Sequence, residues 1–211
     1  MKRDGFYLRY GKGILDRVIG GMGLICLSWL LLLIAVAIEV DDPGPVLFRQ
    51  RRVGMRKDGK LTYFEILKFR TMYQNAPHEV PTHLLNDPEQ WITRVGRILR
   101  RLSLDELPQL WNIAVRHDLS LVGPRPALWN QEDLICARDE YGANDVMPGL
   151  TGLAQIRGRD ELAIAEKARL DGEYARNLSF SMDFRCFAGS LVAVLHGRGV
   201  VEGCSSLEAP K

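Results

Sequence analysis

The strongest constraint on the fold is an uncharged apolar run, Val18 to Ile38, which reads VIGGMGLICLSWLLLLIAVAI. A helix needs about 20 consecutive apolar residues to cross a hydrocarbon core, and this run is long enough. The apolar region of a secretory signal peptide is only roughly 7–15 residues long, so a cleaved signal is disfavoured. The run therefore predicts a membrane anchor over residues 1–42, with its apolar segment at 18–38.

Basic residues flank this run on both sides: Lys2, Arg3, Arg9, Lys12 and Arg17 before it, and Arg49, Arg51, Arg52, Arg56 and Lys57 after it. Segments rich in Lys and Arg tend to stay in the cytoplasm, so both flanks are typical of the same side of the membrane. A helix that enters, bends and returns satisfies both flanks, whereas a spanning helix does not. The candidates for a bend are Gly20, Gly21 and Gly23, and the hydroxyl of Ser28. The residue pattern leaves both forms open.

A β-hairpin is predicted after the rigid turn Pro43-Gly44-Pro45. VLFRQRRVG and LTYFEILKF are β-prone runs, and Asp58-Gly59 between them is a strong hairpin-turn signal. We expect the hairpin to lie at the membrane surface, with Arg49, Arg51 and Arg52 near lipid head groups or a substrate phosphate. The alternative is a solvated basic face.

The rest of the chain is mostly helical by pattern. Apolar residues at helical spacing from Trp91 to Leu102 are interleaved with arginines, which is typical of an interfacial amphipathic helix or of a helix that faces a core. Further helices are predicted at 104–115, 132–141, 160–177 and 184–195, the last stopped by Gly197 and Gly199. Residues 73–90 are a polar, proline-containing loop. The predicted fold class is α+β and mainly helical, with an N-terminal membrane helix, one small β-hairpin and interfacial amphipathic helices.

Composition and missing motifs exclude several functions. The formal net charge is +2, from 28 Lys and Arg against 26 Asp and Glu, and does not favour a nucleic-acid partner. The 4 cysteines and 4 histidines lack zinc-binding or redox spacing. The chain has no G-x-x-x-x-G-K-[ST], G-x-G-x-x-G or D-x-D motif, which argues against P-loop enzymes, dinucleotide enzymes and a common class of metal-dependent glycosyltransferases.

The adjacent acids Asp105 and Glu106 in RLSLDELPQLWN have two interpretations. Ser103 and Glu106 have the spacing of a capping box, which would make the pair a helix start. Phosphate chemistry is the other interpretation, because carboxylates serve as nucleophiles or metal ligands and cations gather in neighbouring motifs. These cations are Lys68, Arg70, Arg100, Arg101, Arg125, Arg157 and Arg159. Turns at 123–126 and 147–152 would hold Arg125 and several backbone amides in place.

The chain resembles the monotopic phosphoglycosyl transferases, also called bacterial sugar transferases, from about Tyr10 to Gly203. The resemblance rests on ordered motifs: LDRVIG, GPVLFRQRRVG, EILKFRTM, RLSLDELPQLWN, DLSLVGPRP, MPGLTGLAQIRGRD and NLSFSMD. It implies an enzyme, in the minimal catalytic form of the family, that moves a sugar 1-phosphate from a UDP-sugar to undecaprenyl phosphate and releases UMP. Such a reaction initiates exopolysaccharide, capsule, O-antigen or glycoprotein glycan assembly.

The resemblance also implies roles for individual residues. Asp105 matches the aspartate that attacks the β-phosphate to form a covalent sugar-phosphate intermediate, and Glu106 matches its acidic partner. The family requires Mg²⁺ near this pair, which makes Asp105 and Glu106 the expected metal site. The family's phosphate-binding cations fall on Lys68, Arg100, Arg125 and Arg159.

A last set of expectations concerns location and partners. The resemblance implies a catalytic domain over residues 43–203 on the cytoplasmic face of the bacterial inner membrane, followed by a tail at 204–211. UDP-sugar, undecaprenyl phosphate and membrane lipid are the expected partners, and a homodimer is one option for the oligomeric state. The family typically breaks its membrane helix at Ser-Pro, whereas this chain has Ser28-Trp29. The basic flanks still favour a re-entrant anchor.

Two rival functions fit part of the pattern. One is a peripheral membrane scaffold whose basic hairpin and helix bind anionic lipid head groups. The other is a transferase that passes the sugar without its phosphate, and its product would be UDP rather than UMP. No residue spacing identifies the sugar.

Overall fold

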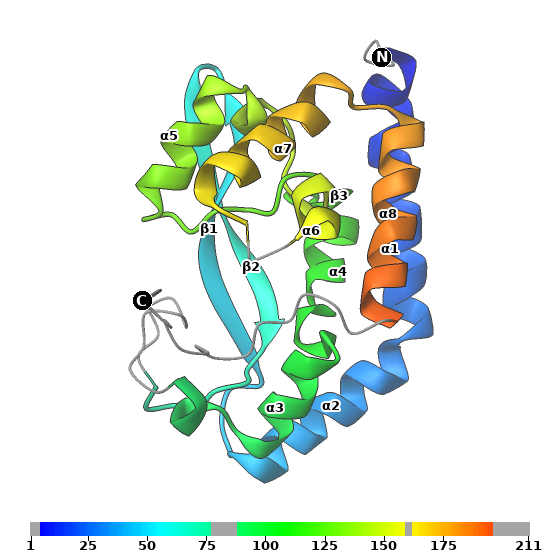
Figure 1. The fold of residues 1–211 in the computed structure, drawn as a ribbon. Coiled ribbons are helices and arrows are strands. Elements are labelled where there is room, and N and C mark those ends of the chain that lie inside the picture. Colours follow the sequence, from blue (N-terminus) through cyan, green and yellow to red (C-terminus); the bar gives the residue numbers. More distant parts are fainter. Residues whose placement is uncertain (1–4, 77–87, 159–161, 196–211) are drawn as a thin grey trace.

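The computed structural model describes residues 5–76, 88–158 and 162–195 (Figure 1). The predicted mainly helical fold with a small antiparallel hairpin is confirmed. In chain order its elements are η1 (Tyr7–Gly11), α1 (Lys12–Cys26), α2 (Ser28–Asp41), β1 (Leu47–Lys57), β2 (Lys60–Phe69), η3 (Pro88–Trp91), α3 (Arg94–Arg101), η4 (Leu104–Glu106), α4 (Gln109–Trp111), η5 (Asn112–Arg116), β3 (Ser120–Val122), α5 (Glu132–Glu140), η6 (Ala143–Asp145), β4 (Gly149–Thr151), α6 (Leu153–Arg157), α7 (Ile164–Arg176) and α8 (Phe180–Leu195).

The apolar run is two helices rather than one. The helical segments Tyr7–Cys26 and Ser28–Asp41 meet at an angle of 61°. Within the described ranges no single helix has the length and apolarity of a membrane span, whereas this bent pair together does. The break lies at Leu27, whose φ of −97° and ψ of 4° leave the helical region. The Ser28 hydroxyl donates to the Ile25 carbonyl at 2.8 Å, so the predicted part of Ser28 in the bend is confirmed.

The glycines of α1 do not make this bend. A Cβ on Gly20 would lie 3.1 Å from the Ile113 side chain, and one on Gly23 would lie 3.2 Å from the Leu110 side chain. Their missing side chains instead let α1 pack closely against the segment from α4 to η5. All three candidate glycines lie inside the continuous helix α1, so the prediction that they supply the bend was wrong. Gly20 and Gly23 serve close approach instead.

The hairpin forms as predicted. Strands β1 and β2 pair antiparallel in a register that runs from Leu47 opposite Phe69 to Lys57 opposite Lys60. Asp58 and Gly59 connect them with positive φ values of 50° and 74°. Asn-Gly and Asp-Gly turns suit hairpins because both central residues tolerate this left-handed backbone. Figure 1 shows the long hairpin with α5 and α7 near one end and α2 and α3 near the other.

A second sheet was not predicted. Strands β3 and β4 pair in parallel. They can lie side by side because a glycine at each strand lets the two backbone segments approach closely. Gly123 N donates to Thr151 O at 2.7 Å, and Gly149 N donates to Pro124 O at 2.9 Å. A Cβ on Gly149 would lie 2.0 Å from Gly123 N. The two turn motifs thus form one joined structure, and three-residue strands are too short to give a sequence pattern.

The predicted helices at 132–141, 160–177 and 184–195 correspond to α5, α7 and α8. Residues 104–115 are helical but change pitch, from the 3₁₀ turn η4 through α4 to the π-helical η5. Helix α3 begins at Arg94 and is capped by Thr93, whose hydroxyl accepts from Gly96 N at 2.9 Å. Gly197 and Gly199, and the tail at 204–211, lie outside the described residues.

The N-terminal helices share their core with the rest of the chain. The largest cluster joins Ile113, Leu119 and Tyr174, and partly buried Leu15 and Leu24 of α1 pack against it. A second cluster joins Ile34 and Ile38 of α2 to Phe69 and Leu99.

A buried polar network ties α1 to α8. The Lys12 ammonium lies 2.6 Å from an Asp183 carboxylate oxygen, and Tyr7 and Tyr174 donate to the same carboxylate at 2.7 and 2.6 Å. Lys12 also donates to Val122 O at the end of β3, at 2.9 Å. All four side chains are buried, so the charges and hydroxyls satisfy one another without water exposure.

The outward faces of α1 and α2 are apolar. Exposed positions include Ile14, Val18, Met22, Ile25, Trp29, Leu32, Leu33, Val36 and Val40. Exposed apolar surface on this scale is unusual for a protein surrounded by water and marks a contact with protein or lipid.

Candidate functional site

Glu106 is the centre of an ion-paired cluster that unites three distant motifs. Lys68, near the end of β2, donates to Glu106 Oε1 at 2.9 Å. Arg125, in the loop after β3, donates to the same oxygen at 2.6 Å. The Glu106 side chain is 15% exposed and that of Lys68 is 17% exposed, so this charge-assisted bond forms largely away from water, whereas the Arg125 side chain is 39% exposed.

Burial tends to raise the pKa of Glu106, but the charges and hydrogen bonds of Arg125 and Lys68 outweigh it. The pKa of this carboxyl is held well below its ordinary value. Glu106 is therefore ionised across the physiological pH range, and it fixes the positions of the two cations.

Asp105 has the opposite character. Its carboxyl is partly buried, and this burial raises its pKa above the ordinary aspartate value. The positive charges of Lys68, Arg100 and Arg125 lower the pKa, and the negative charge of Glu106 raises it. Asp105, Glu106 and three of the four predicted phosphate-binding cations thus form one electrostatic unit. Arg159 lies outside the described residues.

The capping-box interpretation was wrong. Ser103 has a left-handed backbone with φ of 56°, and among the described residues its side chain makes no capping hydrogen bond to η4. The Glu106 carboxylate turns to Lys68 and Arg125 instead of back to the Ser103 amide. Two charged partners outcompete one backbone amide for the carboxylate.

Arg100 reaches the site from α3. Its Nε donates to the Thr71 hydroxyl at 2.8 Å, which fixes the guanidinium beside the strand that carries Lys68. The start of α3 is held by Asp41, whose carboxylate accepts from Val95 N at 2.9 Å. An acid that sequence patterns assign to the end of the anchor therefore caps the helix that supplies Arg100.

A buried ion pair holds the Arg125 loop. Arg138 of α5 donates from two nitrogens to Asp171 Oδ2 of α7, at 2.9 and 2.6 Å. The same guanidinium donates to the Arg125 carbonyl at 2.8 Å. The Arg138 and Asp171 side chains are 6% and 1% exposed. Neither residue was predicted, because their role depends on contacts between α5, α7 and a loop that no local pattern records.

Arg52 was predicted only as part of a basic strand, together with Arg49 and Arg51. Strand alternation separates it from them: Arg49 and Arg51 are exposed, whereas Arg52 lies on the other face and is largely covered. It donates to the Pro126 carbonyl at 3.1 Å, next to Arg125. Period-two alternation along β1 was the signal that could have singled it out.

The carboxylate oxygens suit a small hard cation. Mg²⁺ is commonly held by one or two carboxylates together with substrate phosphates. Asp105 supplies one carboxylate, and Glu106 Oε2, 3.5 Å from an Arg125 nitrogen, supplies a second oxygen. No cluster of three or more His, Cys, Asp or Glu residues that could hold a metal occurs within the described ranges. Two carboxylates could therefore hold a metal only together with further ligands, such as phosphate oxygens of a substrate.

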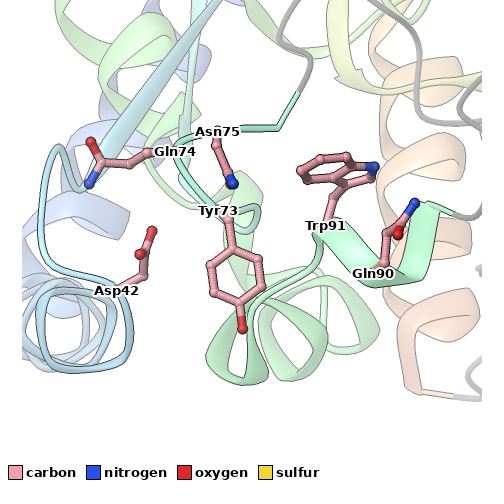
Figure 2. A pocket seen from close by; sticks show the side chains of 6 residues that line it. All are labelled: Asp42, Tyr73, Gln74, Asn75, Gln90 and Trp91. Atoms are coloured by element: carbon pink, nitrogen blue, oxygen red, sulfur yellow. The ribbon is translucent and has the colours of Figure 1, made fainter.

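A pocket of about 360 Å³ lies elsewhere, where the end of α2 meets η3. Figure 2 shows its lining: the rings of Tyr73 and Trp91 stand among the side chains of Asp42, Gln74, Asn75 and Gln90. The acids and cations around Glu106 are absent from this lining. The pocket is thus distinct from the charged cluster.

Comparison with known proteins gives a consistent result. Residues 7–197 match the family described as bacterial sugar transferase. The exopolysaccharide production protein ExoY of Sinorhizobium fredii is 36% identical over 202 residues, which cover 89% of this chain and 87% of that protein. EpsL of Bacillus subtilis, named an uncharacterized sugar transferase, is 38% identical over 177 residues. This match covers 84% of this chain and 83% of EpsL.

A third relative carries a specific reaction in its name. The UDP-glucose:undecaprenyl-phosphate glucose-1-phosphate transferase of Caulobacter vibrioides is 46% identical over 151 residues. The match covers 70% of this chain and 54% of that protein. The chain thus spans about half the length of this relative and most of the other two.

Proposed function

Because the chain belongs to the bacterial sugar transferase family, we propose that it transfers a sugar 1-phosphate from a UDP-sugar to undecaprenyl phosphate and releases UMP. The observation that carries this proposal is the charged cluster, in which Lys68, Arg100 and Arg125 surround Asp105 and Glu106. The named reaction of the Caulobacter relative supports the same donor and acceptor classes. The named exopolysaccharide role of ExoY supports a place at the start of glycan assembly.

The cluster answers the main electrostatic problem of this reaction. A carboxylate approaching a negatively charged diphosphate is repelled, and fixed cations reduce this repulsion where charge develops. Lys68 and Arg125 are already held in place by Glu106, so little reorganisation is required when a phosphate binds. Mg²⁺, when bound by the acids and the diphosphate, would neutralise further phosphate charge.

The proposed chemistry has two displacements at one phosphorus atom. An Asp105 carboxylate oxygen attacks the β-phosphorus of the UDP-sugar, and the bond to the bridging oxygen breaks, so that UMP leaves with the electron pair. A phosphate oxygen of undecaprenyl phosphate then attacks the same phosphorus, and the bond to Asp105 breaks. The lowered pKa of Glu106 favours a role in holding cations or metal over one in moving a proton.

The test is product formation by the full chain in detergent with undecaprenyl phosphate, Mg²⁺ and a panel of UDP-sugars. The panel includes UDP-glucose and UDP-galactose, for which relatives from Caulobacter vibrioides and Erwinia amylovora are named. We expect UMP release with at least one donor, and none from Asp105→Asn protein that keeps its fold. Release of UDP would select transfer of the sugar alone, and no release from any donor would refute the proposal.

The covalent step has its own readout. Wild-type protein mixed with a donor labelled in the β-phosphate, without the lipid acceptor, should acquire the label, and Asp105→Asn should not. Hydroxylamine cleaves acyl phosphates and should release the label. Turnover by wild-type protein without any labelled protein would refute the intermediate while leaving the overall reaction intact.

We also propose that α1 and α2 form a re-entrant anchor in the bacterial inner membrane, with the charged cluster on the cytoplasmic face. The 61° bend and the exposed apolar faces of both helices support this arrangement. Single cysteines near Arg9 and Arg49, in protein without its native exposed cysteines, should both resist a membrane-impermeant thiol reagent added to intact cells. Labelling of one end alone would establish a span.

A further inference from the structure

Arg52 reaches the charged cluster from strand β1, which pairs with the strand that carries Lys68. One terminal nitrogen donates to Pro126 O at 3.1 Å, and the other donates to Gln50 Oε1 at 2.6 Å. Arg52 also forms an antiparallel bridge with Leu128, so strand β1 lies directly along the loop that carries Arg125. The position of the guanidinium is therefore set by backbone pairing as well as by its own hydrogen bonds.

One nitrogen of this guanidinium lacks a hydrogen-bond partner. Among the described residues, the buried Arg52 Nε has no acceptor. Burial, and after it the positive charge of Arg125, lower the pKa of Arg52 to about 10, although Glu106 acts in the opposite direction. A neighbouring positive charge makes a largely covered guanidinium unfavourable unless negative charge compensates it, and a buried donor without an acceptor is costly.

We propose that Arg52 is a further substrate-binding residue, which acts with Arg125 to bind the diphosphate of the nucleotide sugar. This inference rests on the proposed function and adds a residue to it. A diphosphate oxygen would accept a hydrogen bond from Arg52 Nε. Its negative charge would offset the repulsion between the Arg52 and Arg125 guanidinium groups. Arg is suited to this task because its planar donors match phosphate oxygens.

The competing role for Arg52 is to hold the Pro126 loop without touching a ligand. The two roles predict different ligand affinities for the Arg52→Lys variant. A lysine keeps the positive charge for an anion but cannot reproduce the paired bonds to Pro126 and Gln50. If Arg52 binds phosphate, Arg52→Lys retains much of the affinity that Arg52→Met loses. If Arg52 only holds the loop, both variants lose affinity equally.

The experiment measures the dissociation constant of UMP by titration calorimetry with the full-length protein in detergent, with UMP standing for the nucleotide phosphate. We expect Arg52→Met to weaken UMP binding about tenfold or more, because a hydrogen bond between charged groups is lost, and Arg52→Lys to weaken it by less than about threefold. Lys60→Met, which removes an exposed charge at the tip of the same hairpin, is the matched control and should bind like wild type.

Thermal unfolding of each variant accompanies the titrations. Unchanged UMP affinity in Arg52→Met, or equal losses in the lysine and methionine variants, would overturn the assignment. Failure of the proposed function is a separate result: wild-type protein would then bind UMP but release none from any UDP-sugar. Inorganic phosphate, which has no uridine, serves as a second titrant and shows whether the lost affinity belongs to the phosphate group. We expect Arg52→Met to weaken its binding in parallel with that of UMP.

Discussion

Asp105 and Glu106 are consecutive residues whose carboxyl groups are shifted in opposite directions. Burial raises the pKa of Asp105, whereas for Glu106 the effect of burial is outweighed by Arg125 and Lys68, which hold the pKa well below its ordinary value. Neighbouring acids with separated pKa values commonly have different tasks. Here Glu106 holds Lys68 and Arg125 in place. Positive charge from a bound metal would favour the ionised form of Asp105.

The pH dependence of turnover follows from this difference. In the proposed mechanism Asp105 attacks phosphorus as the ionised carboxylate, so activity should fall as the pH falls through its raised pKa. The positive charge of Arg100 lowers this pKa, and Arg100→Gln should therefore raise it and move the acid limb of the kcat/KM profile to higher pH. The control is Arg97→Gln on the exposed side of α3. An acid limb that stays in place would show that Asp105 ionisation does not set it.

The Arg138–Asp171 pair should separate stability from activity. Arg138→Met leaves a buried carboxylate without its partner and should lower the free energy of unfolding by about 3–5 kcal/mol. Adding Asp171→Leu removes the unpaired charge and should recover a large part of this loss in denaturant unfolding. Activity should stay low in the double variant, because the bond from Arg138 to the Arg125 carbonyl is still missing. Full activity there would show that this bond does not position Arg125.

The link between α1 and α8 is a stability prediction. Asp183→Ala leaves the Lys12 ammonium buried without a counter-charge and removes an acceptor from Tyr7 and Tyr174, so unfolding should become easier by about 3–5 kcal/mol. Arg185→Ala, on the exposed side of the same helix, should change stability by less than about 0.5 kcal/mol. The measurement is unfolding in one detergent for all variants. Similar effects of the two substitutions would contradict the buried network.

The contact between Gly123 and Gly149 should tolerate no side chain. A Cβ on Gly149 would lie 2.0 Å from the Gly123 nitrogen, so Gly149→Ala must separate β3 from β4. We expect a loss of about 3 kcal/mol or more and weaker UMP binding, because the Arg125 loop follows β3. Gly21→Ala is the control, since its Cβ would have no atom within 4 Å. If Gly149→Ala had normal stability, strands β3 and β4 would have to lie further apart in solution.

Local chemistry made much of the fold predictable. The Asp58-Gly59 turn fixes the hairpin because its backbone angles are required there, and alternation along the strands does the rest. The helices near 132, 164 and 180 follow from residue preference and spacing. The paired acids and most of their cations were also predictable, because they lie in ordered sequence motifs that can be identified without knowledge of tertiary contacts.

Contacts between distant segments decided what local patterns could not. The capping box failed because Lys68, remote in sequence, competes for Glu106. Gly20 and Gly23 of α1 serve packing rather than bending, because Ile113 and Leu110 lie against them. Arg52 and Arg138 join the site through bonds to the Pro126 and Arg125 carbonyls, which carry no side-chain signature.

The sequence by itself thus determined the apolar N-terminal helices, the hairpin, the helical content and the adjacent acids proposed for the chemistry, because each depends on neighbours along the chain. The tertiary structure alone decided where the anchor bends, how two turn motifs join into a sheet, and which cations meet Glu106. These outcomes depend on burial and on charges brought together from segments far apart in the chain, where desolvation and ion pairing outweigh local preference.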